Sequence, residues 1–138
     1  MDFQYLEHTA DAEFIAYGQT LGEAFANAAR AMYGLMADPA RVRPALAREV
    51  TLIAGSAEDL LVDWLSELLF LTEVDHMVFA TFDVRIAQDG EYWLNAKACG
   101  EKISPRHEIF LHVKAVTYHD LRVEKRNNVY EAQVLLDI

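Results

Sequence analysis

The chain has 138 residues, a length typical of one domain, and its 22 acidic and 12 basic residues give a formal net charge of −10. A single cysteine, Cys99, excludes both an internal disulfide and a zinc site built from cysteines. The first residues lack the basic and apolar regions of a signal peptide, and no apolar run approaches the ~20 residues of a membrane span. We therefore expect one domain over residues 1–138, cytoplasmic and without membrane association.

The charge is unevenly distributed along the chain. No basic residue precedes Arg30, and none lies between Arg48 and Arg85. The acidic residues in the second interval are Glu49, Glu58, Asp59, Asp63, Glu67, Glu73, Asp75 and Asp83. Binding to nucleic-acid phosphates requires clustered Lys and Arg, so we expect little or no direct nucleic-acid binding. A basic protein partner or a cation would suit this surface, although the charge could equally serve solubility alone.

The first part of the chain predicts two short strands followed by a helix. The strands are expected at residues 3–7 and 14–18. The helix begins after Thr20, because Glu23 three residues later completes a capping-box pattern and apolar residues then recur at helical spacing. It ends at Asp38-Pro39, since the residue before a proline avoids the helical region.

A further short strand, at residues 49–53, precedes a second helix. This helix begins near Ser56, with Asp59 in the position that Glu23 occupies in the first helix. Leucines and Trp64 then form one broad apolar face up to Leu71, with acidic residues lying off that face.

The second half of the chain is dominated by strand patterns. Alternating apolar and polar residues are typical of strands with one buried face. Asp89-Gly90 predicts a two-residue hairpin turn, and Asn127-Asn128 a second turn, because asparagine tolerates positive φ. The expected strands span residues 78–86, 92–98, 110–118, 121–125 and 130–136. This order predicts an α+β fold, with two main helices packed on one face of a largely antiparallel sheet in two layers.

Standard catalytic motifs are missing from the sequence. It contains no glycine-rich phosphate loop, no pair of Cys-x-x-Cys motifs and no helix with two histidines at i and i+4. Cys99, expected in a strand beside Gly100, fits a buried inert thiol better than a nucleophile. The histidines show no spacing typical of metal ligands.

Two aspartates near opposite ends of the chain are candidates for a cation site. Asp11 lies between two short apolar stretches, and Asp137 is followed only by Ile138, whose main-chain carboxylate ends the sequence. Carboxylates brought together repel one another unless a cation neutralises them, and hard cations take oxygen ligands. The alternatives are a turn or capping role for Asp11 and a solvated chain terminus.

Lys114 is a further candidate, because it interrupts the mostly apolar segment 110–116. On the simpler interpretation it lies on the solvent face of a half-buried strand. On the functional interpretation its ammonium lies beside the carboxylates, where it balances their charge or contacts a phosphate.

Several segments, in the same order along the whole chain, resemble the archease family. They are Leu6-Glu7-His8-Thr9-Ala10-Asp11, Tyr17-Gly18 with Thr20 to Phe25, Leu60 to Leu69, Gly100-Glu101, Arg106-His107-Glu108, Val113 to His119, and the terminal Asp137-Ile138. One departure is Ala12-Glu13, where the family has an aliphatic residue and often a glycine after the aspartate. Glu13, and also His8, could add to a metal site.

The resemblance implies an archease-like domain that activates an RtcB-type RNA ligase in tRNA splicing and RNA repair. The ligase depends on a metal and uses GTP to guanylate its own histidine, and archease promotes guanylation and multiple turnover. The family's metal ligands correspond to Asp11, Asp137 and Ile138, and Asp11, Lys114 and Asp137 are implied in activation. The resemblance favours calcium as the divalent cation, with magnesium or manganese as alternatives.

Three hypotheses follow. The first is a non-enzymatic, metal-binding activator that docks on the ligase protein. The second is an enzyme, such as a metal-dependent phosphoesterase, although such hydrolases usually have more convergent ligands than this sequence offers. The third, the main alternative to the first, is a general protein chaperone or binding module that acts without metal.

Overall fold

The computed structural model describes residues 1–7 and 11–138. Within these residues it contains two α-helices, two short 3-10 helices and eight strands. In chain order the elements are β1 (Phe3–Leu6), β2 (Asp11–Gly18), α1 (Leu21–Met36), η1 (Pro39–Arg41), β3 (Leu46–Ala54), α2 (Ala57–Asp75), β4 (Met77–Asp89), β5 (Glu91–Lys102), η2 (Pro105–His107), β6 (Ala115–Val116), β7 (Arg122–Arg126) and β8 (Val129–Asp137).

Helix α1 confirms the predicted start and end. The Thr20 hydroxyl accepts a hydrogen bond from the Glu23 main-chain N–H at 3.0 Å, and the helix ends at Met36, just before Asp38-Pro39. Eleven of its sixteen residues are buried, and five of these are alanines. A helix buried on nearly all sides lies between other elements, and small side chains allow those elements to approach it closely.

Helix α2 also begins where the sequence predicts. The Ser56 hydroxyl accepts a hydrogen bond from the Asp59 N–H at 3.1 Å, and the helix ends before His76, which has a left-handed φ of 54°. Its apolar face is buried, and the Trp64 indole N–H donates to the Phe25 carbonyl of α1 at 3.0 Å. This bond holds the two helices together inside the core, where an unpaired indole N–H would be costly.

The two ends of the chain form one antiparallel sheet, here named the terminal sheet. Its strand order is β1-β2-β8-β6, and β7 also pairs with β8. The pairing of β2 with β8 runs from Asp11 opposite Asp137 to Gly18 opposite Tyr130. The predicted hairpin between β7 and β8 is confirmed, because Asn127 and Asn128 both have positive φ.

Three strands from the middle of the chain form the second antiparallel sheet, here named the central sheet, in the order β3-β5-β4. The Asp89-Gly90 hairpin joins β4 to β5 as predicted, with Gly90 at a φ of 75°. Gly100 of β5 is required by packing, since a Cβ there would lie 1.9 Å from the Val78 carbonyl oxygen of β4.

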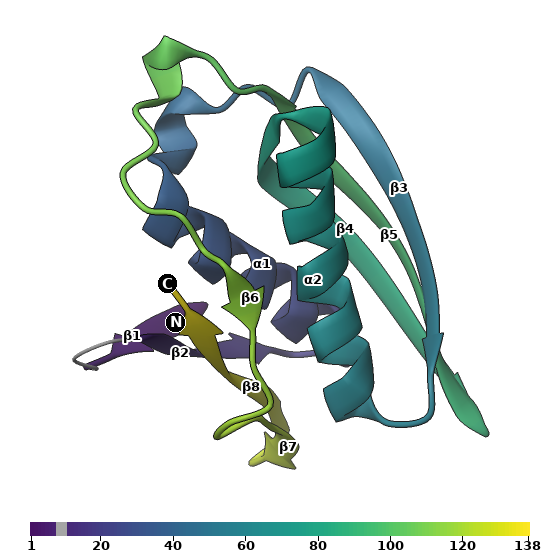
Figure 1. Ribbon diagram of the computed structural model, residues 1–138. Coiled ribbons are helices and arrows are strands. Elements are labelled where there is room, and N and C mark those ends of the chain that lie inside the picture. Colours follow the sequence, from purple (N-terminus) through teal and green to yellow (C-terminus); the bar gives the residue numbers. More distant parts are fainter. Residues whose placement is uncertain (8–10) are drawn as a thin grey trace.

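The α+β class with two main helices and antiparallel strands is confirmed, but the expectation of one sheet in two layers needs correction. The strands divide into two sheets, because the terminal strands pair with one another and the middle strands pair among themselves. Helix α1 packs against both β2 and β4, and α2 packs against β3 (Figure 1). One continuous apolar cluster joins the helices to both sheets.

The strand predicted over residues 110–118 is wrong for most of its length, because only Ala115–Val116 forms a strand, β6. The reason lies in β8, whose outer edge is shared: β6 pairs with Leu136 and Asp137, whereas β7 takes the edge from Val129 to Gln133. Residues 108–114, here named the connecting segment, therefore run without regular pairing from η2, past the end of α1, to β6 (Figure 1).

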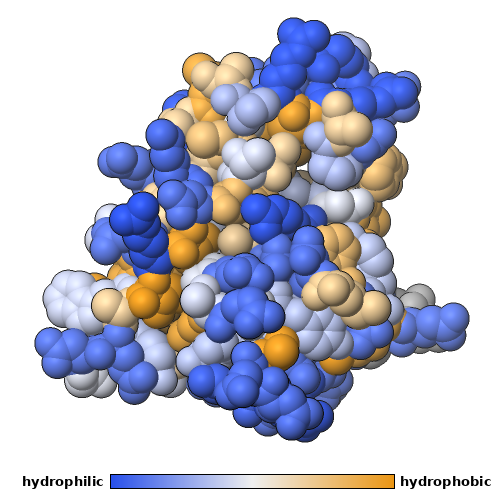
Figure 2. Space-filling view, turned by 180° about the vertical axis from the view of Figure 1, so that it is seen from behind, coloured by the Kyte–Doolittle hydropathy of each residue, from blue (hydrophilic) through white to orange (hydrophobic). Residues whose placement is uncertain are grey.

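Seen from behind, the surface is mostly hydrophilic, with smaller hydrophobic areas between charged groups (Figure 2). Within the part of the chain that the structure describes, no helix is both long and apolar enough to cross a bilayer.

Candidate functional site

The β2–β8 register brings two of the predicted ligands together. Asp11 and Asp137 lie directly opposite each other at the end of this strand pair, although they are far apart in the sequence. Directly opposed residues of an antiparallel pair project to the same face, with Cβ atoms roughly 5 Å apart. The fold thus places both carboxylates side by side at one end of the terminal sheet.

The third predicted ligand, the main-chain carboxylate of Ile138, follows Asp137 directly. Strand alternation turns the Ile138 side chain to the other face, where it packs against the core. This apolar contact anchors the chain terminus next to the two aspartates. A carboxylate at the end of a free tail would have no such fixed position.

Lys114 reaches this site through its main chain. Its N–H donates to the Asp137 carbonyl at 2.8 Å, and the next residue, Ala115, pairs with Asp137 in β6. The Lys114 side chain is exposed and lines a groove beside α2. The main chain of Lys114 is therefore bonded to that of Asp137, while its side chain lines the groove beside α2.

The donor set formed by Asp11, Asp137 and the Ile138 terminus suits a hard cation. Carboxylates directly opposed across a strand pair destabilise it by repulsion, and a bound divalent cation would remove that repulsion. Calcium takes six to eight oxygen ligands, so water or a partner's groups would complete its shell. Within residues 1–7 and 11–138, no three His, Cys, Asp or Glu side chains form a metal-binding group.

Glu13 is the charged residue that sequence reasoning left open. It projects from the same face of β2 as Asp11, and only 7% of its surface is exposed. Its carboxylate accepts a hydrogen bond from the Gln133 side-chain amide at 3.3 Å, and Gln133 in turn accepts two from the Arg122 guanidinium, at 3.1 and 3.2 Å. This network holds Glu13 beside the candidate site.

Gln133 and Arg122 were not singled out from the sequence. The available signal was the period of two along β8, because residues 137, 135, 133 and 131 share one face. This period does not predict which strands pair with β8, and that pairing brings Arg122 to Gln133. Arg122 also donates hydrogen bonds to Glu131 of β8 and Glu124 of β7.

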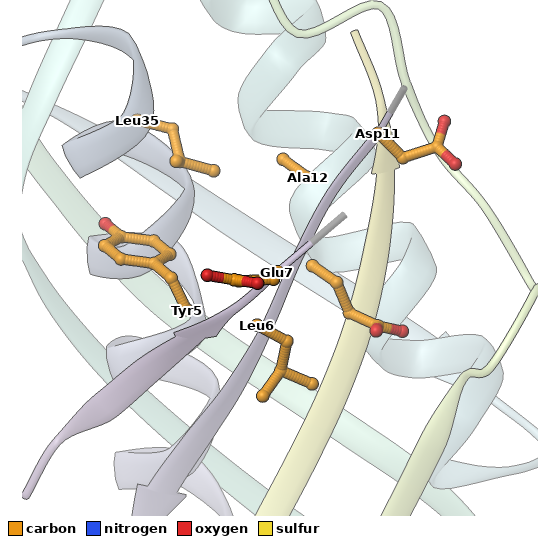
Figure 3. A pocket seen from close by; sticks show the side chains of 7 residues that line it. Tyr5, Leu6, Glu7, Asp11, Ala12 and Leu35 are labelled. Atoms are coloured by element: carbon orange, nitrogen blue, oxygen red, sulfur yellow. The ribbon is translucent and has the colours of Figure 1, made fainter. Parts of the chain in front are cut away.

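An open pocket lies at the end of β1 and β2 beside Asp11. Its lining residues are Tyr5, Leu6, Glu7, Asp11, Ala12, Glu13 and Leu35. The Asp11 carboxylate points over β8, away from Tyr5 and Leu35 (Figure 3). His8, the other residue considered as an additional ligand, lies outside the described residues.

A polar cluster around the buried His107 anchors the start of the connecting segment. The Glu101 carboxylate of β5 accepts hydrogen bonds from His107 Nε2 at 2.8 Å, from the Arg43 N–H at 3.0 Å and from the Arg106 guanidinium. These bonds, with that of His107 foremost, lower the pKa of Glu101 to about 2. Because His107 Nδ1 accepts the Ser104 N–H at 2.9 Å, the neutral Nε2-protonated ring fits both partners.

Comparison with known proteins finds relatives that match nearly the whole chain. The model of the Archease protein family matches residues 3–138. Protein archease of Methanosarcina acetivorans is 49% identical, covering 99% of this chain and 95% of the relative. Protein archease of Pyrococcus furiosus is 37% identical, covering 99% and 98%. None of these names specifies a catalysed reaction.

Two solved structures share the fold. The solution structure of Methanobacterium thermoautotrophicum protein 1598 has a TM-score of 0.90 and 39% identity and covers 99% of each chain. The crystal structure of a Thermotoga maritima archease, described as a possible chaperone, has a TM-score of 0.62 and 20% identity, covering 96% and 94%, and supports the fold alone. The family model and the curated relatives together show that this chain belongs to the Archease protein family.

Proposed function

We propose that this protein is a cation-binding, non-catalytic activator of an RtcB-type RNA ligase, acting in the cytoplasm in tRNA splicing and RNA repair. It promotes guanylation and multiple turnover of the ligase. The observation that carries the proposal is the β2–β8 register, which sets Asp11 opposite Asp137 beside the chain terminus in a member of the Archease protein family.

Asp11, Asp137 and the terminal carboxylate of Ile138 are the groups that would hold the divalent cation, and calcium suits these oxygen ligands. A cation held there would neutralise the charge of the carboxylates. The residues of this chain orient the ligands: the β2–β8 pairing sets the two aspartates, and the Ile138 side chain fixes the terminus.

Lys114 supplies the positive charge next to this site. Its main chain is bonded to Asp137, and its exposed ammonium is available to a phosphate or an acidic group of the partner. The net charge of −10 favours the ligase protein over its RNA as the direct partner, because a polyanion would be repelled.

A ligation assay with purified ligase, GTP and RNA tests the proposal. Asp11→Asn, Asp137→Asn and Lys114→Met are compared with wild type, and Asp83→Asn, which removes an exposed strand carboxylate from the central sheet, serves as the matched control. We expect the first three variants to reduce ligase guanylation and turnover at least tenfold and the control to leave both unchanged. Equal stimulation by Asp11→Asn, Asp137→Asn and wild type would show that the proposed site is wrong.

Two further measurements separate the other functions. Turnover of RNA or nucleotides by this protein without ligase would indicate an enzyme. Protection of unrelated proteins from aggregation, undiminished by a chelator, would indicate a general chaperone. Under the proposal, neither is observed, and stimulation of the ligase decreases when the chelator is added.

A further inference from the structure

A groove of about 520 Å³ lies between the C-terminal half of α2 and the chain from residue 109 to β6. Its apolar lining includes Leu69, Phe70, Ile109, Val113, Ala115 and Val116. Its polar lining groups include Glu73, His112 and Lys114. Grooves of this size and composition are typical of binding sites, because apolar walls supply affinity and a few polar groups supply orientation.

The rim of this groove exposes large apolar side chains. Phe70 of α2 lines the groove and is 56% exposed. On the other side of the groove, Ile109 of the connecting segment is 40% exposed. Apolar side chains gathered around one opening mark an interaction surface more often than isolated exposed residues do.

On the side of α2 that lines the groove, the exposed residues nearer the N-terminus of the helix are acidic, and this line of residues is here named the acidic stripe. The exposed residues Asp59, Asp63, Ser66, Phe70 and Glu73 recur at spacings of three and four, which places them on one stripe of the helix. Partial burial and the charge of Asp59 raise the pKa of Asp63. Among the described residues no Lys or Arg pairs with Asp59 or Asp63, so this stripe is complementary to a basic partner.

We propose that the groove and the acidic stripe together dock one segment of the partner ligase, with apolar side chains inserted between α2 and the connecting segment and Lys or Arg facing Asp59 and Asp63. The proposal rests on the proposed function in taking the ligase as the partner. A second copy of this chain is a poorer occupant, because the chain is itself strongly acidic.

Docking here brings the partner next to the candidate cation site. Lys114 and Ala115 line the groove, while Lys114 N–H donates to the Asp137 carbonyl and Ala115 pairs with Asp137. Figure 1 shows β6 between α2 and the end of β8. A segment seated in the groove would therefore contact Lys114 and Ala115, whose main chains are bonded to or paired with Asp137.

The chain that forms this wall of the groove is held in place on both sides. Tyr118, just after β6, donates its hydroxyl hydrogen to the Asp59 carboxylate at 2.9 Å, and the Glu101 cluster fixes η2 before the connecting segment begins. Because the wall is tied down before and after the groove, the groove is preformed, which reduces the entropy lost on binding.

Binding of purified ligase, measured by calorimetry at low and high salt, tests the proposal. Phe70→Ser removes an apolar anchor and Asp63→Lys reverses a charge of the stripe; Trp93→Ser and Asp83→Lys make the same kinds of change on the outer face of the central sheet, where Trp93 is 44% exposed. We expect Phe70→Ser and Asp63→Lys each to weaken binding about tenfold or more, and Asp63→Lys also to weaken its salt dependence. The controls should stay within about twofold of wild type.

The outcomes distinguish this inference from the proposed function. If wild type binds and stimulates the ligase and both groove variants bind equally well, only the docking site is overturned. If wild type neither binds nor stimulates the ligase, both proposals are overturned. Sedimentation adds a third readout, since self-association that is abolished by Phe70→Ser would assign the groove to a second copy and would overturn docking of the ligase. Calcium binding by Phe70→Ser, unchanged from wild type, verifies that the variant is folded.

Discussion

Replacement of Asp137 by asparagine is expected to change the thermal stability of the protein in opposite directions with and without a divalent cation. In the absence of a cation, the carboxylate of Asp137 lies directly opposite that of Asp11 on one face of the β2–β8 pair and close to the terminal carboxylate. The Asp137→Asn substitution removes one of these repelling charges while keeping the size of the side chain, so the cation-free variant should be the more stable protein.

The two effects differ in size. Like charges directly opposed on a strand pair cost about 0.5 kcal/mol, which corresponds to roughly 2 °C in Tm for a domain of this length. A cation at 100 times its dissociation constant stabilises the folded state by about 2.7 kcal/mol, or roughly 10 °C. Because Asp137→Asn lacks one of the three ligands, it should gain little of this increase and become the less stable protein.

Differential scanning calorimetry in chelator and in excess calcium measures the difference in Tm between wild type and variant under both conditions. Asp11→Asn should behave like Asp137→Asn, whereas Asp83→Asn in the central sheet should show the full calcium-induced rise of wild type. The reasoning is refuted if calcium raises the Tm of Asp137→Asn as much as that of wild type, or if this variant melts below wild type in chelator.

Three further predictions concern the stability of the fold. The pKa of Glu101 is lowered to about 2, chiefly by the hydrogen bond from His107. The ionised carboxylate therefore stabilises the folded state above the ordinary carboxyl pKa of 4.5, and this stability is lost as the pH falls towards 2. The urea midpoint of wild type should fall more steeply between pH 4.5 and 2 than that of Glu101→Gln. Gly100→Ala should lose about 2 kcal/mol of unfolding free energy, because its Cβ would meet a β4 carbonyl, whereas Gly55→Ala, with open space around it, should be nearly neutral in the same urea titration. Trp64→Phe should cost about 1–2 kcal/mol in that assay through the lost bond to α1 and the smaller ring, and an unchanged midpoint would contradict this role.

The elements with local signals were predicted from the sequence. Thr20 and Ser56 cap α1 and α2 because a hydroxyl acts on an N–H only three residues away, and Asp89-Gly90 turns the chain through the backbone freedom of Gly90 itself. These interactions involve neighbours in the sequence, so their patterns are visible without knowledge of the fold.

The failed prediction over residues 110–118 had the opposite cause. The apolar pattern of Phe110 to Val116 is compatible with a strand, but a strand also needs a partner edge, and β7 already occupies most of the available edge of β8. The pattern of apolar residues indicates which side chains of a segment can be buried. Whether the segment pairs as a strand depends on competition for a strand edge with segments that are distant in the sequence.

In the candidate site, too, the residue types could be predicted from the sequence, whereas their arrangement could not. Asp11, Lys114, Asp137 and Ile138 were named from the sequence and from its resemblance to the archease family, because their types and positions are readable along the chain. Their proximity, the hydrogen bond from Gln133 to Glu13, and the groove beside α2 arise only from the folded structure. Local propensity, charge and turn chemistry are properties of short segments, whereas the β2–β8 register that joins the two ends of the chain depends on burying one apolar core between two sheets and two helices.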